Sequence, residues 1–166
     1  FRAYEEVAPV QVMGAKLDQW LYNTQVTWSG VTRTPRLAGY GDLLIEQAYA
    51  YDVPIWLALG QCWRESQWGT TGLSIDHNCL WGVKDTSGKW GALRGTVAGF
   101  ADYVSVPECV RAYYRLMDSP AYRGYIDAED WARLLNKYDP QVSDGGAQHL
   151  RIVMIVKAWC EGHGIR

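Results

Sequence analysis

The sequence predicts a mainly helical α+β domain in which a small β-lobe forms one side of a cleft. Apolar residues recur at helical spacing in several segments. A glycine-containing stretch from Thr70 to Gly99 interrupts this pattern, and helical spacing returns from about Val106. The length of 166 residues suits one domain. We place the domain at residues 40–166, with residues 1–39 as an N-terminal extension packed on it.

Composition and charge exclude several classes of protein. The 18 acidic and 16 basic residues give a net charge of −2, and the basic residues are scattered, which argues against nucleic acid as a partner. A hydrophobic content of 48% excludes wholesale disorder. No uninterrupted apolar run exceeds five residues, whereas about 18 are needed to cross a bilayer. We therefore expect a compact domain without membrane insertion.

The first helix is expected from Gln11 to Tyr22, where apolar residues form a rough stripe. The following stretch, Asn23 to Gly39, is rich in Thr, Ser, Gly and Pro and predicts an extended loop. The chain begins at Phe1 and has no charged segment followed by an apolar one, so no signal peptide is visible. We infer a processed or excised piece of a longer protein.

Two helices follow in close succession. Helical spacing of apolar residues runs from Gly41 to Tyr51. Pro54 suits the first position of the next helix, which we expect to reach about Gln67. Its first half is apolar almost all round, which is typical of a central, buried helix.

The β-lobe comes next, and helices return after it. Turn residues Asp85 to Gly88 separate two strand-like pieces and predict a small hairpin. Further helices are expected from about Val106, at Asp127–Lys137 with Asp127 as the N-cap, and at Ala147–Gly162. Between the last two helices, residues 138–146 form a polar loop.

The strongest chemical candidate is Glu65, which lies near the C-terminal end of the apolar helix, shortly before Gly69. Burial and the negative end of the helix dipole both disfavour its charged form, whereas Arg64 would oppose them if it turned inward. A raised pKa would keep the carboxyl group protonated near neutral pH, as a general acid requires. The alternative is an exposed glutamate in a salt bridge.

Two short motifs carry a family resemblance. Residues 65–69 read Glu-Ser-Gln-Trp-Gly and, after eight residues, 78–84 read Asn-Cys-Leu-Trp-Gly-Val-Lys. Together they resemble the glucosaminidase-type peptidoglycan hydrolases (glycoside hydrolase family 73), which carry Glu-Ser-x-Trp-Gly and then Asn-Asn-Leu-Phe-Gly-Ile-Lys. Weaker similarity at residues 100–108 and 138–140 extends the resemblance over about residues 40–160.

The resemblance implies a lysozyme-like fold and an endo-β-N-acetylglucosaminidase that cleaves the β-1,4 glycan backbone of the bacterial cell wall. It implies Glu65 as the catalytic acid, Tyr138 as the tyrosine facing it, and Asn78 and Trp81 as motif residues in substrate binding. Peptidoglycan would be the partner of a monomeric chain, and no cofactor or metal is needed. The setting would be extracellular or at the cell wall, as a secreted bacterial autolysin, a phage endolysin or a module of a larger protein.

The sequence departs from the family at two places: Cys79 replaces the second asparagine of the motif, and the Thr-x-Glu common in the family's β-lobe has no counterpart here. The missing carboxylate leaves the second catalytic group open. Asp85 or Asp102 could activate water and give inversion. Alternatively, the 2-acetamido group of the substrate could attack while Tyr138 positions it. We slightly prefer this route, since it needs one strong acid. The rival functions are a muramidase or lytic transglycosylase on the same fold, and a non-catalytic glycan-binding module.

Aromatic and sulfur-containing residues have two interpretations each. Trp68, Trp81 and Trp90 are expected to line a groove as stacking platforms for sugar rings, with core packing as the alternative. The three histidines show no metal-ligand spacing. The four cysteines could form two disulfides, Cys62–Cys79 and Cys109–Cys160, or remain buried free thiols.

Overall fold

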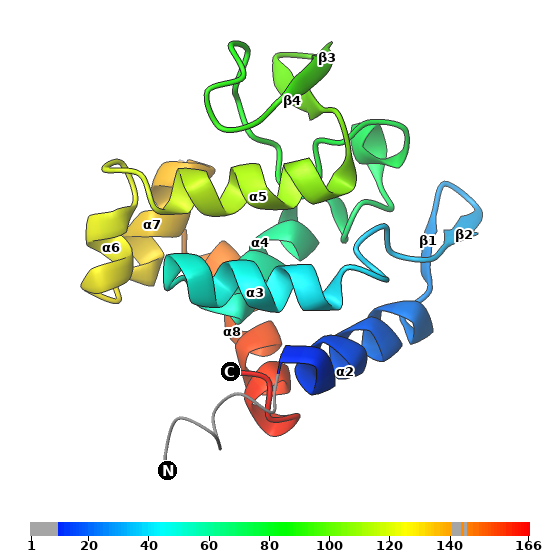
Figure 1. Ribbon diagram of the computed structural model, residues 1–166, viewed down its shortest axis with the longest axis vertical. Coiled ribbons are helices and arrows are strands. Elements are labelled where there is room, and N and C mark those ends of the chain that lie inside the picture. Colours follow the sequence, from blue (N-terminus) through cyan, green and yellow to red (C-terminus); the bar gives the residue numbers. More distant parts are fainter. Residues whose placement is uncertain (1–9, 141–143, 145) are drawn as a thin grey trace.

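The computed structural model describes residues 10–140, 144 and 146–166. These residues form seven α-helices, one short 3-10 helix and two small two-stranded antiparallel sheets (Figure 1). The expected mainly helical architecture is confirmed. Within the described residues, no helix is both long and apolar enough to cross a membrane.

The centre of the fold is helix α4 (Ile55–Ser66), which begins after Pro54 as expected and is buried along most of its length. Helices α3 (Gly41–Tyr51), α5 (Val106–Met117) and α8 (Ala147–Gly162) surround it (Figure 1). The closest approach is to α8: a Cβ atom on Gly60 would lie 2.8 Å from the Cα of Val153. A glycine is therefore needed where these two helices touch.

The N-terminal segment adds a helix and an unexpected hairpin. Helix α2 (Val10–Asn23) confirms the predicted helix and packs on α3, with Gly14 against Gly41. The predicted loop instead contains strands β1 (Val26–Trp28) and β2 (Val31–Arg33). The β-branched residues favour strands, and the turn at 29–30 has positive φ at both positions, which matches the twist of a hairpin.

The β-lobe is a hairpin, although it is placed differently from the prediction. Its strands are β3 (Leu93–Val97) and β4 (Phe100–Tyr103), joined by a turn at residues 98–99. The predicted hairpin around residues 85–88 is wrong, because the Asp85 carboxylate accepts hydrogen bonds from the backbone N–H groups of Lys89 and Trp90 and closes a loop there. The 3-10 helix η1 (Gly72–Ile75) lies between α4 and this lobe in the sequence.

The C-terminal half follows the prediction with one shift. The short helix α6 (Arg123–Asp127) precedes α7 (Trp131–Tyr138), and Asp130 is the N-cap of α7, where its side chain accepts from Arg133 N–H. The predicted cap at Asp127 is therefore wrong. Part of the predicted polar loop at 138–146 lies outside the described residues, and α8 has the predicted bounds.

The four cysteines are free and buried, so neither candidate disulfide is formed. The thiol of Cys62 lies 3.7 Å from the Leu80 carbonyl oxygen and 3.8 Å from the Ser66 hydroxyl. The core thus accommodates these side chains as small apolar groups with a weak donor.

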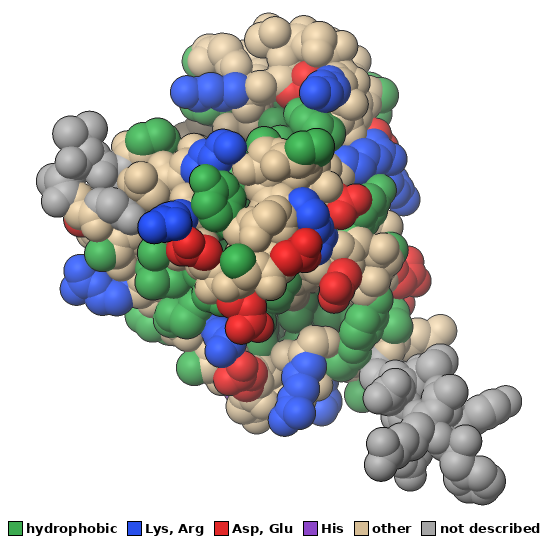
Figure 2. All heavy atoms as spheres, turned by 90° about the vertical axis from the view of Figure 1, so that its left-hand side faces the viewer, with side chains coloured by type: hydrophobic (Ala, Val, Ile, Leu, Met, Phe, Trp, Pro, Cys, Tyr) green, Lys and Arg blue, Asp and Glu red, His purple; other side chains and the backbone are tan. Residues whose placement is uncertain are grey.

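The surface that carries α6 and α7 has mixed charge. Figure 2 shows that acidic side chains gather near the middle of this face, with basic side chains among and around them. Arg123 illustrates the pattern, since it pairs with Asp118 at 3.1 Å and Asp127 at 3.3 Å. On this face the charges are interspersed, in line with the scattered basic residues of the sequence.

Candidate active site

A cleft of about 310 Å³ lies beside the C-terminal end of α4. Its lining comes from β1, the end of α4, the segment around η1, the 78–84 motif and the start of β4, and it includes Trp28, Glu65, Leu73, Gly82 and Phe100. Glu65 is the one carboxyl group among the described lining residues. A larger hollow of about 770 Å³, between α3, α6 and α8, contains none of the predicted site residues.

Glu65 is half-buried, and its two oxygens differ in surroundings. Oε1 is buried and has no hydrogen-bond partner among the described residues. Oε2 faces Gly82, where an added Cβ atom would lie 3.4 Å away. Gly82 has a φ of 62°, a conformation that favours glycine. The second motif therefore passes its backbone directly over the carboxyl group.

The electrostatics of the site raise the pKa of Glu65 to about 7. Burial is the main cause, and the negative charge of Asp139 adds to it, whereas the positive charge of Arg64 acts in the opposite direction. Arg64 in turn lies 3.5 Å from the Asp139 carboxylate. The raised pKa expected for Glu65 is thus confirmed, and a large fraction of the protein carries it protonated at neutral pH.

The turn after Glu65 is held in an unusual conformation. Gln67, Trp68 and Gly69 all have positive φ, at 46°, 59° and 87°. Two successive non-glycine residues in this region carry strain, which the surrounding contacts must offset. The Ser66 hydroxyl donates to the Leu80 carbonyl at 2.7 Å and accepts from the Gly69 N–H at 2.9 Å. The first of these bonds joins the end of α4 to the second motif, and the second closes the turn that follows Glu65.

The structure places two of the predicted stacking residues in the core. Trp68 and Trp81 are buried, and their indole N–H groups donate to the carbonyl oxygens of Leu59 and Ala58, each at 2.9 Å. A sugar ring needs an exposed aromatic face, so neither residue offers a platform in this structure. Trp90 is half-buried beneath the Lys89 ammonium group and does not line the cleft.

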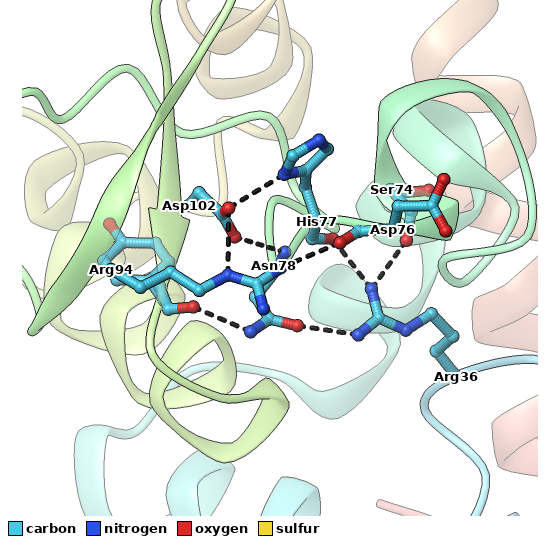
Figure 3. A network of polar contacts seen from close by, with 8 residues as sticks. Arg36, Ser74, Asp76, His77, Asn78, Arg94 and Asp102 are labelled. Carbon is cyan, nitrogen blue, oxygen red and sulfur yellow. Dashed lines mark hydrogen bonds and ion pairs between the residues drawn. The ribbon is translucent and has the colours of Figure 1, made fainter.

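Asn78 belongs to a polar network that anchors the β-lobe (Figure 3). Its side-chain oxygen accepts from Arg36 and its amide donates to the Tyr103 carbonyl, both at 2.7 Å. In the same network Asp102 accepts from His77, from Arg94 and from the backbone N–H of Asn78. These bonds lower the pKa of Asp102, although burial acts against them. Both side chains are committed to holding the loop.

Asp85 also has a structural environment. Besides the two backbone N–H groups noted above, its carboxylate accepts from the Tyr103 hydroxyl at 3.3 Å. Burial would raise the pKa of Asp85, but these hydrogen bonds outweigh it and the pKa is lowered. Asp85 does not line the cleft.

Tyr138 lies close to the acid without lining the cleft. Its hydroxyl donates to the carbonyl oxygen of Trp81, immediately before Gly82. Its pKa is raised, first by burial and then by the charge of Glu65. Tyr138 thus supports the turn that contacts Glu65.

Glu65 and two side chains beside it could together hold a metal ion. Glu65, Asp139 and His149 each present one ligand atom, and these atoms lie within 4.8 Å of one another. His149 is fully buried, neither ring nitrogen has a hydrogen-bond partner among the described residues, and burial lowers its pKa to about 4. Arg64 already pairs with Asp139, and a proton on Glu65, whose pKa of about 7 lies near neutrality, would compete with a cation at this cluster.

Trp28, Asp139 and His149 were not predicted as site residues. The strand residues and Ser-Gly turn around Trp28 could have revealed its hairpin. Asp139 lies in the weakly similar segment 138–140 but was given no role, and no local pattern marks His149. The packing of α7 and α8 on the core brings both beside Glu65.

Comparison with known proteins identifies the class. Residues 41–143 match the glucosaminidase family, described as mannosyl-glycoprotein endo-β-N-acetylglucosaminidase, and the chain belongs to this family. Its relatives include Protein bax of Escherichia coli (strain K12), which is 30% identical over 112 residues. That match covers 67% of this chain and 39% of the relative, so the chain corresponds to about two fifths of that protein. No solved structure gave a significant match.

Proposed function

We propose that this chain is a peptidoglycan hydrolase, an endo-β-N-acetylglucosaminidase in which Glu65 is the general acid. The observation that carries the proposal is the position of Glu65, a half-buried carboxyl group in an open cleft with one oxygen unpartnered among the described residues. Family membership supports glycoside hydrolysis. The substrate places the site of action at the bacterial cell wall, and we propose a monomeric extracellular lysin or module.

In the proposed reaction, Glu65 gives its proton to the oxygen that leaves C1 of an N-acetylglucosamine unit. As this C–O bond breaks, the acetamido oxygen of the same sugar bonds to C1. Water then attacks C1, releases the acetamido oxygen and passes a proton to the Glu65 carboxylate. Tyr138 acts as a positioning residue through the Trp81 carbonyl.

The substrate-assisted route is favoured because Glu65 is the one carboxyl group among the described cleft residues. Asp85 and Asp102 are engaged by loop hydrogen bonds. The anomer released first decides between the routes, by NMR of a soluble glycan digest. The β-anomer supports attack by the acetamido group, whereas the α-anomer would show that water attacks directly.

The bond that is cut is tested by mass spectrometry of digested peptidoglycan. A reducing-end N-acetylglucosamine supports the proposal. Reducing-end or anhydro-N-acetylmuramic acid would instead identify a muramidase or a lytic transglycosylase. Binding of peptidoglycan without release of fragments would identify a glycan-binding module.

Asp139→Asn should move the alkaline limb of the pH–activity profile to lower pH by about one pH unit. The Asp139 charge raises the pKa of Glu65, so its removal lowers that pKa. Activity requires protonated Glu65. As pH is raised, the variant should therefore lose activity at a lower pH than the parent does, while both remain active near pH 5. Initial rates on solubilised peptidoglycan between pH 4.5 and 9 provide the measurement.

Asp118→Asn is the matched control, because it removes one surface carboxylate that pairs with Arg123 in the same way that Asp139 pairs with Arg64. Its profile should coincide with that of the parent. An unshifted alkaline limb in Asp139→Asn would show that Asp139 does not set the protonation of the catalytic group.

A further inference from the structure

The β1–β2 hairpin precedes residues 41–143, which match the family, yet it supplies one wall of the cleft that contains Glu65. We propose that Trp28 of this hairpin is a sugar-binding residue, whose indole face stacks on a pyranose ring of the glycan strand held at Glu65. This inference rests on the proposed function and assigns a substrate contact to the segment outside the matched residues.

The first support is the availability of the Trp28 ring. Its exposed fraction is 43%, and among the described residues it has no aromatic or cationic partner. Other tryptophans use their faces inside the protein: Trp20 stacks on Trp159 at 3.7 Å, and Trp81 stacks on Tyr113. Trp28 therefore keeps a free aromatic face at the edge of the cleft.

The second support is the direction in which Trp28 points. Side chains two positions apart on a strand lie on the same face, so Trp28 shares its face with Val26, which is buried in the core. The hairpin thus directs both side chains toward the body of the protein. Val26 packs into the protein, whereas Trp28, two residues further along the strand, lies at the cleft. Its ring therefore borders the cleft and is open to solvent.

The third support is the chemistry across the cleft. Leu73 and Phe100 provide further apolar surface, and Thr71, Ser74 and the Glu65 carboxyl group provide polar atoms. A pyranose ring has apolar C–H faces and hydroxyl groups around its edge, so it needs an aromatic plane beside hydrogen-bonding groups. The volume of about 310 Å³ accommodates a glycan segment of one to two sugar units.

The hairpin is also held in place before any ligand binds. The Thr27 and Thr32 hydroxyls are 2.8 Å apart across its strands. Shortly after the hairpin, Arg36 donates to the carbonyl oxygens of Ser74 and His77 on the opposite side of the cleft, at 2.6 and 2.7 Å (Figure 3). A preorganised wall loses little conformational entropy when it binds a sugar.

Calorimetric titration with the tetramer of β-1,4-linked N-acetylglucosamine tests the inference. The titrated proteins are the Glu65→Gln variant, which does not consume the ligand, and the double variant with Trp28→Ala. The double variant should bind about tenfold more weakly, whereas Trp28→Phe should retain most of the affinity because it keeps a stacking face. In the active protein, Trp28→Ala should raise KM with little change in kcat.

Val31→Ala is the matched control, since Val31 pairs with Trp28 across the hairpin and is similarly exposed but does not line the cleft. When introduced into the Glu65→Gln protein, it should leave the affinity unchanged. The changes at Trp28 and Val31 should also leave the melting temperature of the protein that receives them unchanged. Equal binding by the Trp28→Ala protein, or no binding by Glu65→Gln to the tetramer and to peptidoglycan, overturns the inference. If instead the ligand binds through Trp28 but the active protein hydrolyses nothing, the proposed function fails and the binding site stands.

Discussion

Glu65→Gln should reduce hydrolysis of peptidoglycan by about 10²–10⁴-fold, the usual contribution of a general acid. Glutamine has nearly the same shape but cannot donate the proton that the leaving oxygen requires. Release of soluble reducing ends from purified cell wall, measured at pH 6, checks this. Activity within a factor of three of the parent would remove Glu65 from the mechanism.

The stability of the same variant separates this effect from misfolding. The folded-state pKa of Glu65, about 7, lies above the ordinary value of 4.5. The stabilisation that protonated Glu65 gives to the folded state is therefore fully present at low pH and is lost as pH rises through 7. The glutamine side chain of the Glu65→Gln variant does not titrate, so this variant should melt at or above the parent temperature at pH 8. An inactive variant with a lower melting temperature would point to structural damage instead.

Gly60→Val should produce the largest loss of stability, about 3 kcal/mol in the free energy of unfolding. A Cβ atom at residue 60 would lie 2.8 Å from the Cα of Val153, and a backbone atom cannot move aside without separating α4 from α8. Urea unfolding followed by circular dichroism gives the value. Because α4 also carries Glu65, we expect activity to fall with stability.

Gly124→Val is the matched control, since Gly124 is also helical but has no atom near an added Cβ. Its free energy of unfolding should differ from that of the parent by less than about 1 kcal/mol, because the change affects helix propensity alone. Similar losses in both variants would show that the α4–α8 contact is not as tight as the structure indicates.

The sequence predicted the helices well where the signals are local. Apolar spacing and the residues at the ends placed α3 and α8 at their observed bounds. The sequence-based prediction was wrong where several nearby residues could have played the same local role and only tertiary contacts determine which one does. Asp127 and Asp130 are both plausible caps, and only the folded chain selects Asp130. Likewise, Asp85 sits in a turn-forming stretch, but its hydrogen bonds close a loop there and the hairpin forms further along.

The sequence motifs lead to residues that line the cleft, Glu65 among them, whereas the catalytic role of Glu65 stays a prediction. Glu65 lies in the last turn of an apolar helix and begins a motif, so its position and raised pKa could be inferred. Tryptophan content does not distinguish a core ring from an exposed one, which is why Trp81, expected in the groove, is buried, while the exposed Trp28 was not predicted. Asp139 acts on Glu65 from a segment more than 70 residues away, and such a pairing depends on the packing of distant helices.

Because the four cysteines are buried and form no disulfide, the stability of the fold should not depend on redox conditions. Noncovalent contacts, without disulfides, hold the described fold together, so dithiothreitol should leave its melting temperature unchanged. The thiols of Cys62, Cys109 and Cys160 are fully buried, so maleimide reagents should reach them only when the chain opens, whereas Cys79 lines the cleft. The labelling rate of the three fully buried thiols therefore reports how often this domain unfolds.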